Sequence, residues 1–290
     1  MRNEKEMLDL IIGFANDDAR IRAVMMNGSR ANPAAPKDIF QDYDIIYFVT
    51  SVDEFVRDRS WIQRFGELII MQTPDEMGIP SPTESDSFAF LMLFQDGNRI
   101  DLTLYPVDKL DSLERDSLSV LLLDKDHILG PLPSSSNRDY LTVPPTAKQF
   151  ADCCNEFWWV STYVAKGLWR RELPYAKYTF ERPVRDMLTL MLQWDIGVQT
   201  DFAVDSGKCG KYFSKYLEAR QWDAYVKTFA NGEYEEAWNA LFVMCDLFRE
   251  TAVKVAQHFG YAYPDDDDKR VSGYLRHVKE LPPDAQGIYE

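Results

Sequence analysis

The first half of the chain alternates between two spacings of apolar residues, one typical of helices and the other of strands. Residues 3–15 carry apolar side chains three and four positions apart, which predicts an amphipathic helix. Asn3 is its predicted N-cap, because Glu6 follows three residues later as in a capping box. Three short β-rich apolar runs predict strands at residues 21–26, 44–49 and 88–94.

Residues 99–105 show the clearest strand pattern in the sequence. Three apolar residues alternate with Arg99, Asp101 and Thr103. The strand is therefore expected to bury one face and to present these polar side chains on the other. Before it, residues 74–86 form a loop rich in proline and serine, which is long enough to reach over a site.

The second half of the chain has a helical pattern. Apolar residues recur at three- and four-residue spacing in residues 150–168 and 238–255, and Gly260 is the predicted end of the later helix. Glycine, proline and serine between residues 130 and 145 indicate a domain boundary. The run of four aspartates at 265–268 is interpreted as a solvated tail segment. These patterns predict an α+β protein: an N-terminal domain with a mixed β-sheet flanked by helices, then an all-helical C-terminal domain.

Composition and charge narrow the class of protein. Hydrophobic residues make up 46% of the chain, which is enough for packed cores, and no apolar run is long enough to span a membrane. The start of the chain has no apolar signal region, so a soluble, cytoplasmic protein is expected. The 47 acidic and 32 basic residues argue against a nucleic-acid partner. A cationic small molecule is compatible with this charge.

Three aspartates are expected to converge in the first domain. Asp42 and Asp44 are two residues apart at the start of a predicted strand, so they project to the same side. Asp101 lies on the polar face of another predicted strand. Three carboxylates repel one another unless a cation neutralises them, and oxygen ligands without His or Cys favour Mg²⁺. The sequence therefore predicts a magnesium site at these residues.

A glycine-containing turn offers hydrogen-bond donors and positive charge to phosphate groups. Gly28, Ser29 and Arg30 follow a predicted strand and should open a helix or a tight loop. Glycine permits close approach of the backbone to a triphosphate, Ser29 offers an amide and a hydroxyl donor, and Arg30 can add a charge-assisted contact. We expect these three residues to bind the nucleotide.

The strand, Gly-Ser turn, Asp-x-Asp and third aspartate together resemble the DNA polymerase β-like nucleotidyltransferases. More specifically, the sequence resembles the aminoglycoside 6-adenylyltransferase family, from the first helix to residues 261–265. The segments that carry this resemblance are 28–32, 40–44, 100–104, 122–126 and 152–158. The family transfers AMP from ATP to the 6-hydroxyl of streptomycin-type drugs, so the resemblance implies MgATP and a cationic aminoglycoside as ligands, and drug resistance as the outcome.

The resemblance also implies domain limits and residue roles. Residues 1–135 would form the nucleotidyltransferase catalytic domain, and residues 146–290 the helical substrate-binding domain. Asp42 and Asp44 would hold Mg²⁺, and Asp101 would be the third metal ligand and a candidate general base. A Gly-Lys-containing stretch of the family corresponds to residues 207–212, which places Lys208 and Lys211 on the triphosphate or, equally, in solvent.

Four residues are candidates for binding the acceptor. Glu84 and Asp86 lie in the loop before the strand at 88–94, where a solvated loop is the alternative. Glu156 and Trp159 lie in an aromatic-rich helix, where they could contact a cation. The alternative for Glu156 is a partly buried structural acid.

Two departures from the family pattern keep other functions open. Asn27 stands where the family usually has glutamate, and Tyr178 and Thr179 stand where it tends to have Asp-His. These changes favour, as an alternative, the same chemistry on another antibiotic or on a protein hydroxyl. A non-catalytic, antitoxin-like nucleotide-binding module is a further alternative. The oligomeric state is expected to be monomer or homodimer.

Overall fold

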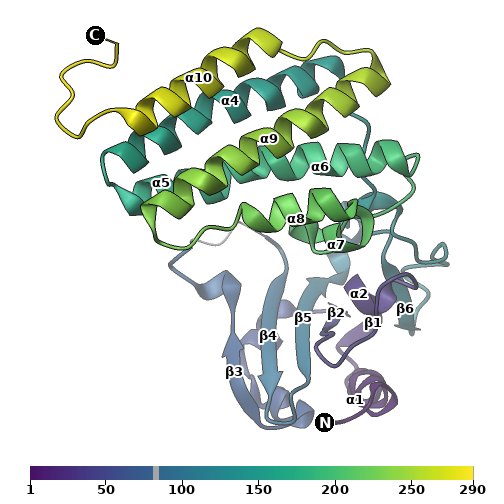
Figure 1. The fold of residues 1–290 in the computed structure, drawn as a ribbon. Helices are drawn as coiled ribbons and strands as arrows, with labels where there is room; N and C mark the ends of the chain where they lie inside the picture. The colour runs from purple at the N-terminus through teal and green to yellow at the C-terminus, as the bar shows by residue number, and fades with distance from the viewer. Residues whose placement is uncertain (81–84, 290) are drawn as a thin grey trace. The chain divides into compact units, whose positions relative to one another are not determined.

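The computed structural model describes residues 1–80 and 85–289. The chain divides into two compact units, Met1–Asp139 and Tyr140–Glu290, each with its own apolar core. The first unit contains a β-sheet with a few helices, and the second consists of helices (Figure 1). This confirms the predicted α+β class.

The sheet of the first unit is mixed. Within the described residues it has six strands in the order β3-β4-β5-β2-β1-β6. Strands β2 and β5 pair in parallel, whereas the other neighbours are antiparallel. The strands are β1 (Ile21–Asn27), β2 (Tyr43–Val49), β3 (Leu68–Gln72), β4 (Phe88–Phe94), β5 (Arg99–Pro106) and β6 (Ser119–Asp124).

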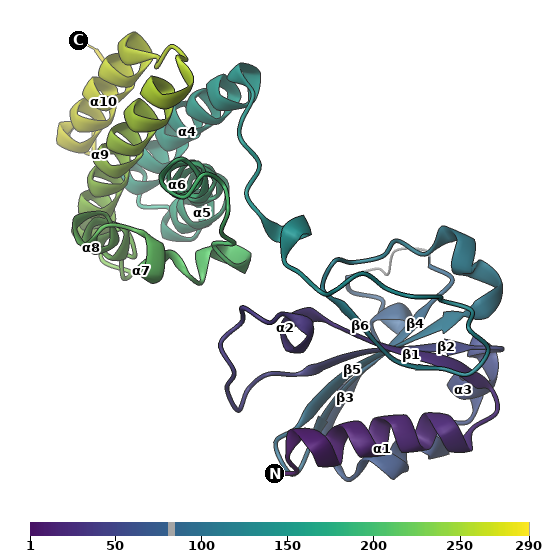
Figure 2. The same ribbon diagram turned by 90° about the vertical axis from the view of Figure 1, so that its right-hand side faces the viewer.

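Helices cover one face of this sheet. Helix α1 (Glu4–Asp17) runs along it, and α3 (Val52–Arg57) and the 3₁₀ segment Ser60–Phe65 complete the layer (Figure 2). Asn3 and Glu6 form the predicted capping box of α1. On the opposite face, a smaller cluster packs β1 and β2 against the 3₁₀ segment Val107–Ser112 and Leu129.

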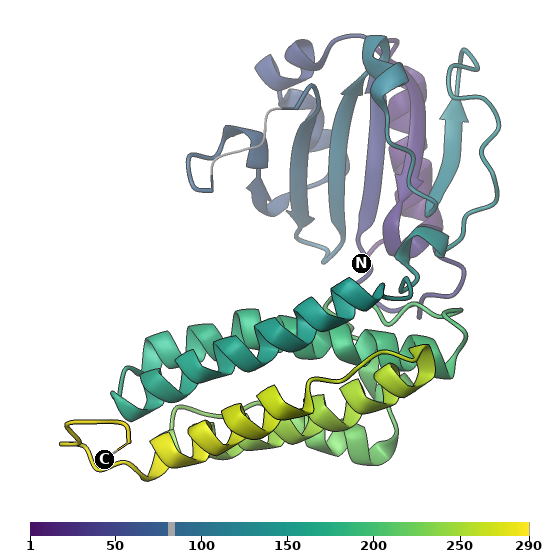
Figure 3. The ribbon, with the colours of Figure 1, turned by 90° about the horizontal axis from the view of Figure 1, so that it is seen from above.

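The second unit is built around two long helices. These are α4 (Ala147–Trp169) and α9 (Tyr234–Phe259), which lie in the helical unit drawn in Figure 3. They contact through Phe157 and Phe248, whose rings stack with centroids 3.7 Å apart. Gly260 ends α9 in the left-handed conformation, as predicted. No helix among the described residues is long and apolar enough to cross a membrane. The other helices of this unit are α5 (Leu173–Thr179), the π-helical turn Phe180–Val184, α6 (Arg185–Gln199), α7 (Phe213–Tyr216), α8 (Ala219–Lys227) and α10 (Asp265–Glu280).

The prediction that residues 265–268 form a solvated tail segment is wrong for their conformation and for Asp268, whereas Asp265, Asp266 and Asp267 are exposed as predicted. These aspartates form the first turn of α10, where negative charge is favourable next to the unpaired amide groups of the helix. Asp268 is only 4% exposed and accepts a hydrogen bond of 2.7 Å from Nη2 of Arg249 on α9. The acidic run therefore starts a helix and fastens it to the bundle.

Candidate active site

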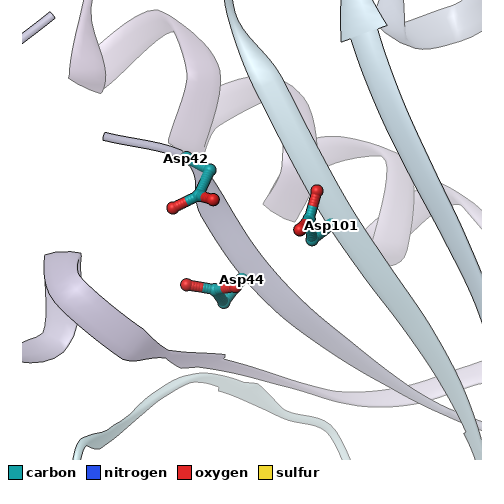
Figure 4. Close-up of side chains that lie close together, drawn as sticks. All are labelled: Asp42, Asp44 and Asp101. Atoms are coloured by element: carbon teal, nitrogen blue, oxygen red, sulfur yellow. The ribbon is translucent and has the colours of Figure 1, made fainter. Parts of the chain in front are cut away.

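The register of the sheet brings the three predicted carboxylates together. Strand β2 pairs in parallel with β5 so that Asp44 lies directly opposite Asp101. Asp42 precedes β2 by one residue and projects to the same side as Asp44 (Figure 4). One ligand oxygen from each of the three side chains lies within 4.8 Å of the other two. The cluster is therefore compact enough for the three groups to share one cation.

The charges in this cluster are not balanced. Burial, and then repulsion by Asp42 and Asp101, raise the pKa of Asp44 to about 7. A group of this kind gains most from a hard divalent cation, which neutralises the repulsion and accepts carboxylate oxygens. The cluster therefore fits the magnesium ion that the sequence predicts, and the ligand role of the three residues stays a prediction.

Gly28 is in contact with the carboxylate of Asp44. The residue has φ of +72°, and a Cβ atom built on it would lie 2.0 Å from Oδ2 of Asp44. Gly28 also begins α2 (Gly28–Ala31), the one-turn helix that follows β1. Both the left-handed backbone and the close approach therefore require glycine here.

We expect Gly28→Ala to abolish activity, because the new methyl group displaces the Asp44 carboxylate. Gly130→Ala is the matched control: Gly130 also has positive φ, but a methyl group added to it would meet no atom within 4 Å. Both variants should lose roughly 1–2 kcal/mol of stability from the strained backbone. Thermal unfolding and turnover measure the two effects. Full activity in Gly28→Ala would contradict the assignment of Asp44 to the site.

Ser29 and Arg30, the other two residues of the Gly-Ser turn predicted to bind the nucleotide, make different contacts. The side-chain amide of Gln41 lies 3.4 Å from the hydroxyl of Ser29, beside the carboxylate cluster. The guanidinium of Arg30 donates to the main-chain carbonyls of Gln41 and Asp42 and stacks on the ring of Tyr43. Arg30 thus holds the segment that carries Asp42, and its contact with the nucleotide stays a prediction.

Sequence reasoning missed Arg99. Its Nε and Nη2 atoms donate to the two oxygens of Asp101 at 2.7 and 2.6 Å, and Nε lies 3.9 Å from Oδ2 of Asp42. The available signal was the spacing, because residues 99 and 101 of one strand project to the same face.

The predicted acceptor residues belong to both units: Asp86 lies in the first, and Glu156 and Trp159 lie in the second. Asp86 is exposed and pairs with Lys109 at 3.6 Å, and Glu84 lies outside the described residues. Glu156 and Trp159 both lie on α4. The alternative that Glu156 is a partly buried structural acid is wrong, because Glu156 is exposed, although positions 153–154 and 157–158 around it are buried. Trp159 is 60% exposed and donates to the Tyr163 hydroxyl.

The predicted lysines of the second unit lie in a tight turn. Lys208 and Lys211 are exposed and flank Cys209 and Gly210, which both have positive φ. Their role toward the triphosphate stays a prediction. In the first unit, Asn27, which departs from the family pattern, accepts a hydrogen bond of 2.9 Å from the hydroxyl of Ser119.

The sequence is similar to known proteins over nearly its whole length. Residues 1–278 match the family model for streptomycin adenylyltransferase. The chain is 41% identical over 270 residues to an aminoglycoside 6-adenylyltransferase of Bacillus subtilis, covering 92% of this chain and 95% of that protein. A second such protein, from Campylobacter jejuni, is 40% identical over 97% of both chains. A crystal structure of an aminoglycoside 6-adenyltransferase from Bacillus subtilis is 36% identical, with a TM-score of 0.49, and covers 97% of this chain and 100% of that one.

The chain is therefore an enzyme of the nucleotidyltransferase class. It belongs to the streptomycin adenylyltransferase family, whose model matches nearly its whole length.

Proposed function

We propose that this enzyme transfers AMP from ATP, with Mg²⁺, to a hydroxyl group of an aminoglycoside, most specifically the 6-hydroxyl of streptomycin. The observation that carries the chemistry is the cluster of Asp42, Asp44 and Asp101, in which three oxygens lie within 4.8 Å of one another. The acceptor class follows from the relatives, which are named as aminoglycoside 6-adenylyltransferases.

Different residues of the first unit have different roles in the proposed transfer. Asp42, Asp44 and Asp101 would hold the divalent metal, which when bound neutralises the phosphates and lowers the pKa of the acceptor hydroxyl. The hydroxyl oxygen forms a bond to the α-phosphorus, the bond from that phosphorus to the bridging oxygen breaks, and pyrophosphate leaves. Asp101 is the proposed acceptor of the hydroxyl proton. Gly28 and Ser29 offer the backbone and hydroxyl groups for the phosphates.

A cavity in the second unit supports a cationic acceptor. Its volume is about 570 Å³, within the range of small-molecule sites. Asp152 and Glu156 of α4 line it together with Gln193 and Trp194 of α6. Lys148 pairs with Asp152, whereas Glu156 has no ion pair among the described residues. Two carboxylates beside an indole ring suit the guanidinium and ammonium groups of an aminoglycoside.

The test is pyrophosphate release from MgATP with and without streptomycin. We expect release to depend on streptomycin and to yield an adenylylated drug with the mass of AMP added. If no aminoglycoside in a broad panel supports release while ATP still binds, the acceptor assignment is wrong. A protein or another antibiotic would then be the acceptor, as the departures at Asn27, Tyr178 and Thr179 suggest.

We expect Glu156→Gln to raise the KM for streptomycin roughly five- to tenfold, because removal of one charge-assisted contact costs about 1–1.5 kcal/mol. The KM for ATP should not change. Glu236→Gln, an exposed acid on α9 outside this cavity, is the control. An unchanged KM for streptomycin in Glu156→Gln would exclude this cavity as the acceptor site.

A further inference from the structure

Arg99 occupies the carboxylate cluster as a counter-ion. Its planar guanidinium grips both oxygens of Asp101 in a two-bonded fork, at 2.7 and 2.6 Å, and lies 3.9 Å from Asp42. Within residues 1–80 and 85–289, no other cation lies within ion-pairing distance of the three carboxylates. Arg99 is therefore the counter-cation of this cluster within the described residues.

The same geometry makes Arg99 a competitor of the metal. A divalent cation shared by the three aspartates needs an oxygen of Asp101, and both of these oxygens already accept hydrogen bonds from Arg99. Two cations at this spot would also repel each other. The side chain is free to leave, because it is 48% exposed and its hydrogen bonds go to Asp101 alone among the described residues.

We propose that Arg99 is an internal counter-cation that yields Asp101 to the divalent metal and then binds the phosphates of the nucleotide. This inference rests on the proposed function. The released guanidinium starts from the polar face of β5, beside the cluster to which the phosphates would be drawn. Its planar fork matches a phosphate group as well as it matches a carboxylate. Arg99 would thus hold Asp101 until the metal and the nucleotide bind together.

The first arm of the test measures metal binding without nucleotide. Free Mn²⁺ is titrated by electron paramagnetic resonance at pH 8 against the wild type, Arg99→Gln and Arg99→Lys. We expect Arg99→Gln to bind Mn²⁺ roughly fivefold more tightly, since a partly exposed ion pair no longer competes. Arg99→Lys keeps the charge and should behave more like the wild type. Unchanged or weaker Mn²⁺ binding by Arg99→Gln would overturn the proposal.

The second arm measures the nucleotide. Calorimetry with Mg²⁺ and a non-hydrolysable ATP analogue is expected to show roughly tenfold weaker binding by Arg99→Gln, because a charge-assisted contact to phosphate is lost. Arg22→Gln is the matched control, since Arg22 forms an equivalent fork with Asp126, at 2.6 Å for both bonds, outside the cluster. This control should move neither measurement. Tighter Mn²⁺ binding with unchanged analogue binding would overturn the phosphate step.

The two proposals fail in different ways. Mn²⁺ binding requires neither an acceptor nor transfer, so it tests Arg99 separately from the choice of drug. If the wild type transfers AMP to streptomycin but Arg99→Gln leaves Mn²⁺ binding unchanged, only the inference on Arg99 is wrong. If neither the wild type nor Arg99→Gln binds Mn²⁺, with or without the ATP analogue, both proposals are wrong.

Discussion

Asp42→Asn is expected to reduce turnover about a thousandfold while the protein stays folded. The substitution keeps the size of the side chain but removes one of three charges that would hold the metal, and metal stabilisation of the transferring phosphate is worth several kcal/mol. At about 1.4 kcal/mol for each factor of ten, a loss of about 4 kcal/mol gives this reduction. Asp42 is one third exposed, so its replacement should cost little stability. Pyrophosphate release under saturating substrates measures the effect.

Asp126→Asn serves as the control for this experiment. Asp126 also belongs to the first unit and also pairs with an arginine, but it lies outside the carboxylate cluster. Its replacement should leave turnover within about a factor of two of the wild type, as expected for a surface ion pair. Turnover above a tenth of the wild-type value in Asp42→Asn would contradict the assignment of Asp42 as a metal ligand.

Asp44→Asn is expected to abolish activity and yet to stabilise the metal-free protein at pH 8. Asp44 has a folded-state pKa of about 7, above the ordinary value near 4 of an unfolded chain. Between these values the folded protein holds a proton that the unfolded chain has lost, so stability falls as the pH rises through this window. Asparagine removes that dependence. Thermal unfolding in chelator should show a higher Tm for the variant, with a larger difference at pH 8 than at pH 5.5, by roughly 2–4 °C for each kcal/mol of burial cost and repulsion removed.

Asp96 provides a control with the opposite sign. The Arg2 guanidinium beside it, helped by Asn98, holds the pKa of Asp96 well below its usual range. Its stabilising effect is present above the unfolded pKa and is lost as the pH falls, so Asp96→Asn should lower the Tm at pH 8.

Added Mg²⁺ should raise the Tm of the wild type at pH 8 and leave that of Asp44→Asn nearly unchanged. A Tm of Asp44→Asn below that of the wild type at pH 8 would contradict the unfavourable burial and repulsion of the Asp44 carboxylate.

The sequence was most informative where local pattern and tertiary burial agree. The alternation at 99–105 predicted β5 and the polar position of Asp101, because one strand face is wholly apolar and the other is not. The edge strands β3 and β6 were missed. Ile69 and Ile70 of β3 are both more than half exposed, so no alternation marks this strand. Its strand conformation comes from pairing with β4, which is a tertiary contact that a local pattern does not contain.

The sequence also did not predict which groups pair with the charged side chains. The aspartates at 265–268 looked like a solvated run because their composition is extreme, yet Asp268 is buried by Arg249, nineteen residues earlier in the chain. Similarly, the three catalytic candidates could be named from sequence, but Arg99 was missed. Its spacing from Asp101 indicates a shared strand face, yet it does not show which of several acids the guanidinium contacts. The sequence predicts which charges meet better than it predicts which cation neutralises them.

The parallel pairing of β2 with β5 has a consequence for how this enzyme fails. Side chains of a strand alternate between two faces, so Asp101 either lies beside Asp44 or, after a slip of one residue, points to the opposite side. Ile100, Leu102 and Leu104, all fully buried, hold the correct alignment. Substitutions in this apolar stripe should therefore not cause a partial loss of turnover in every molecule. It should instead divide the population into fully competent and wholly inert molecules, so that specific activity reports the yield of correctly aligned sheets.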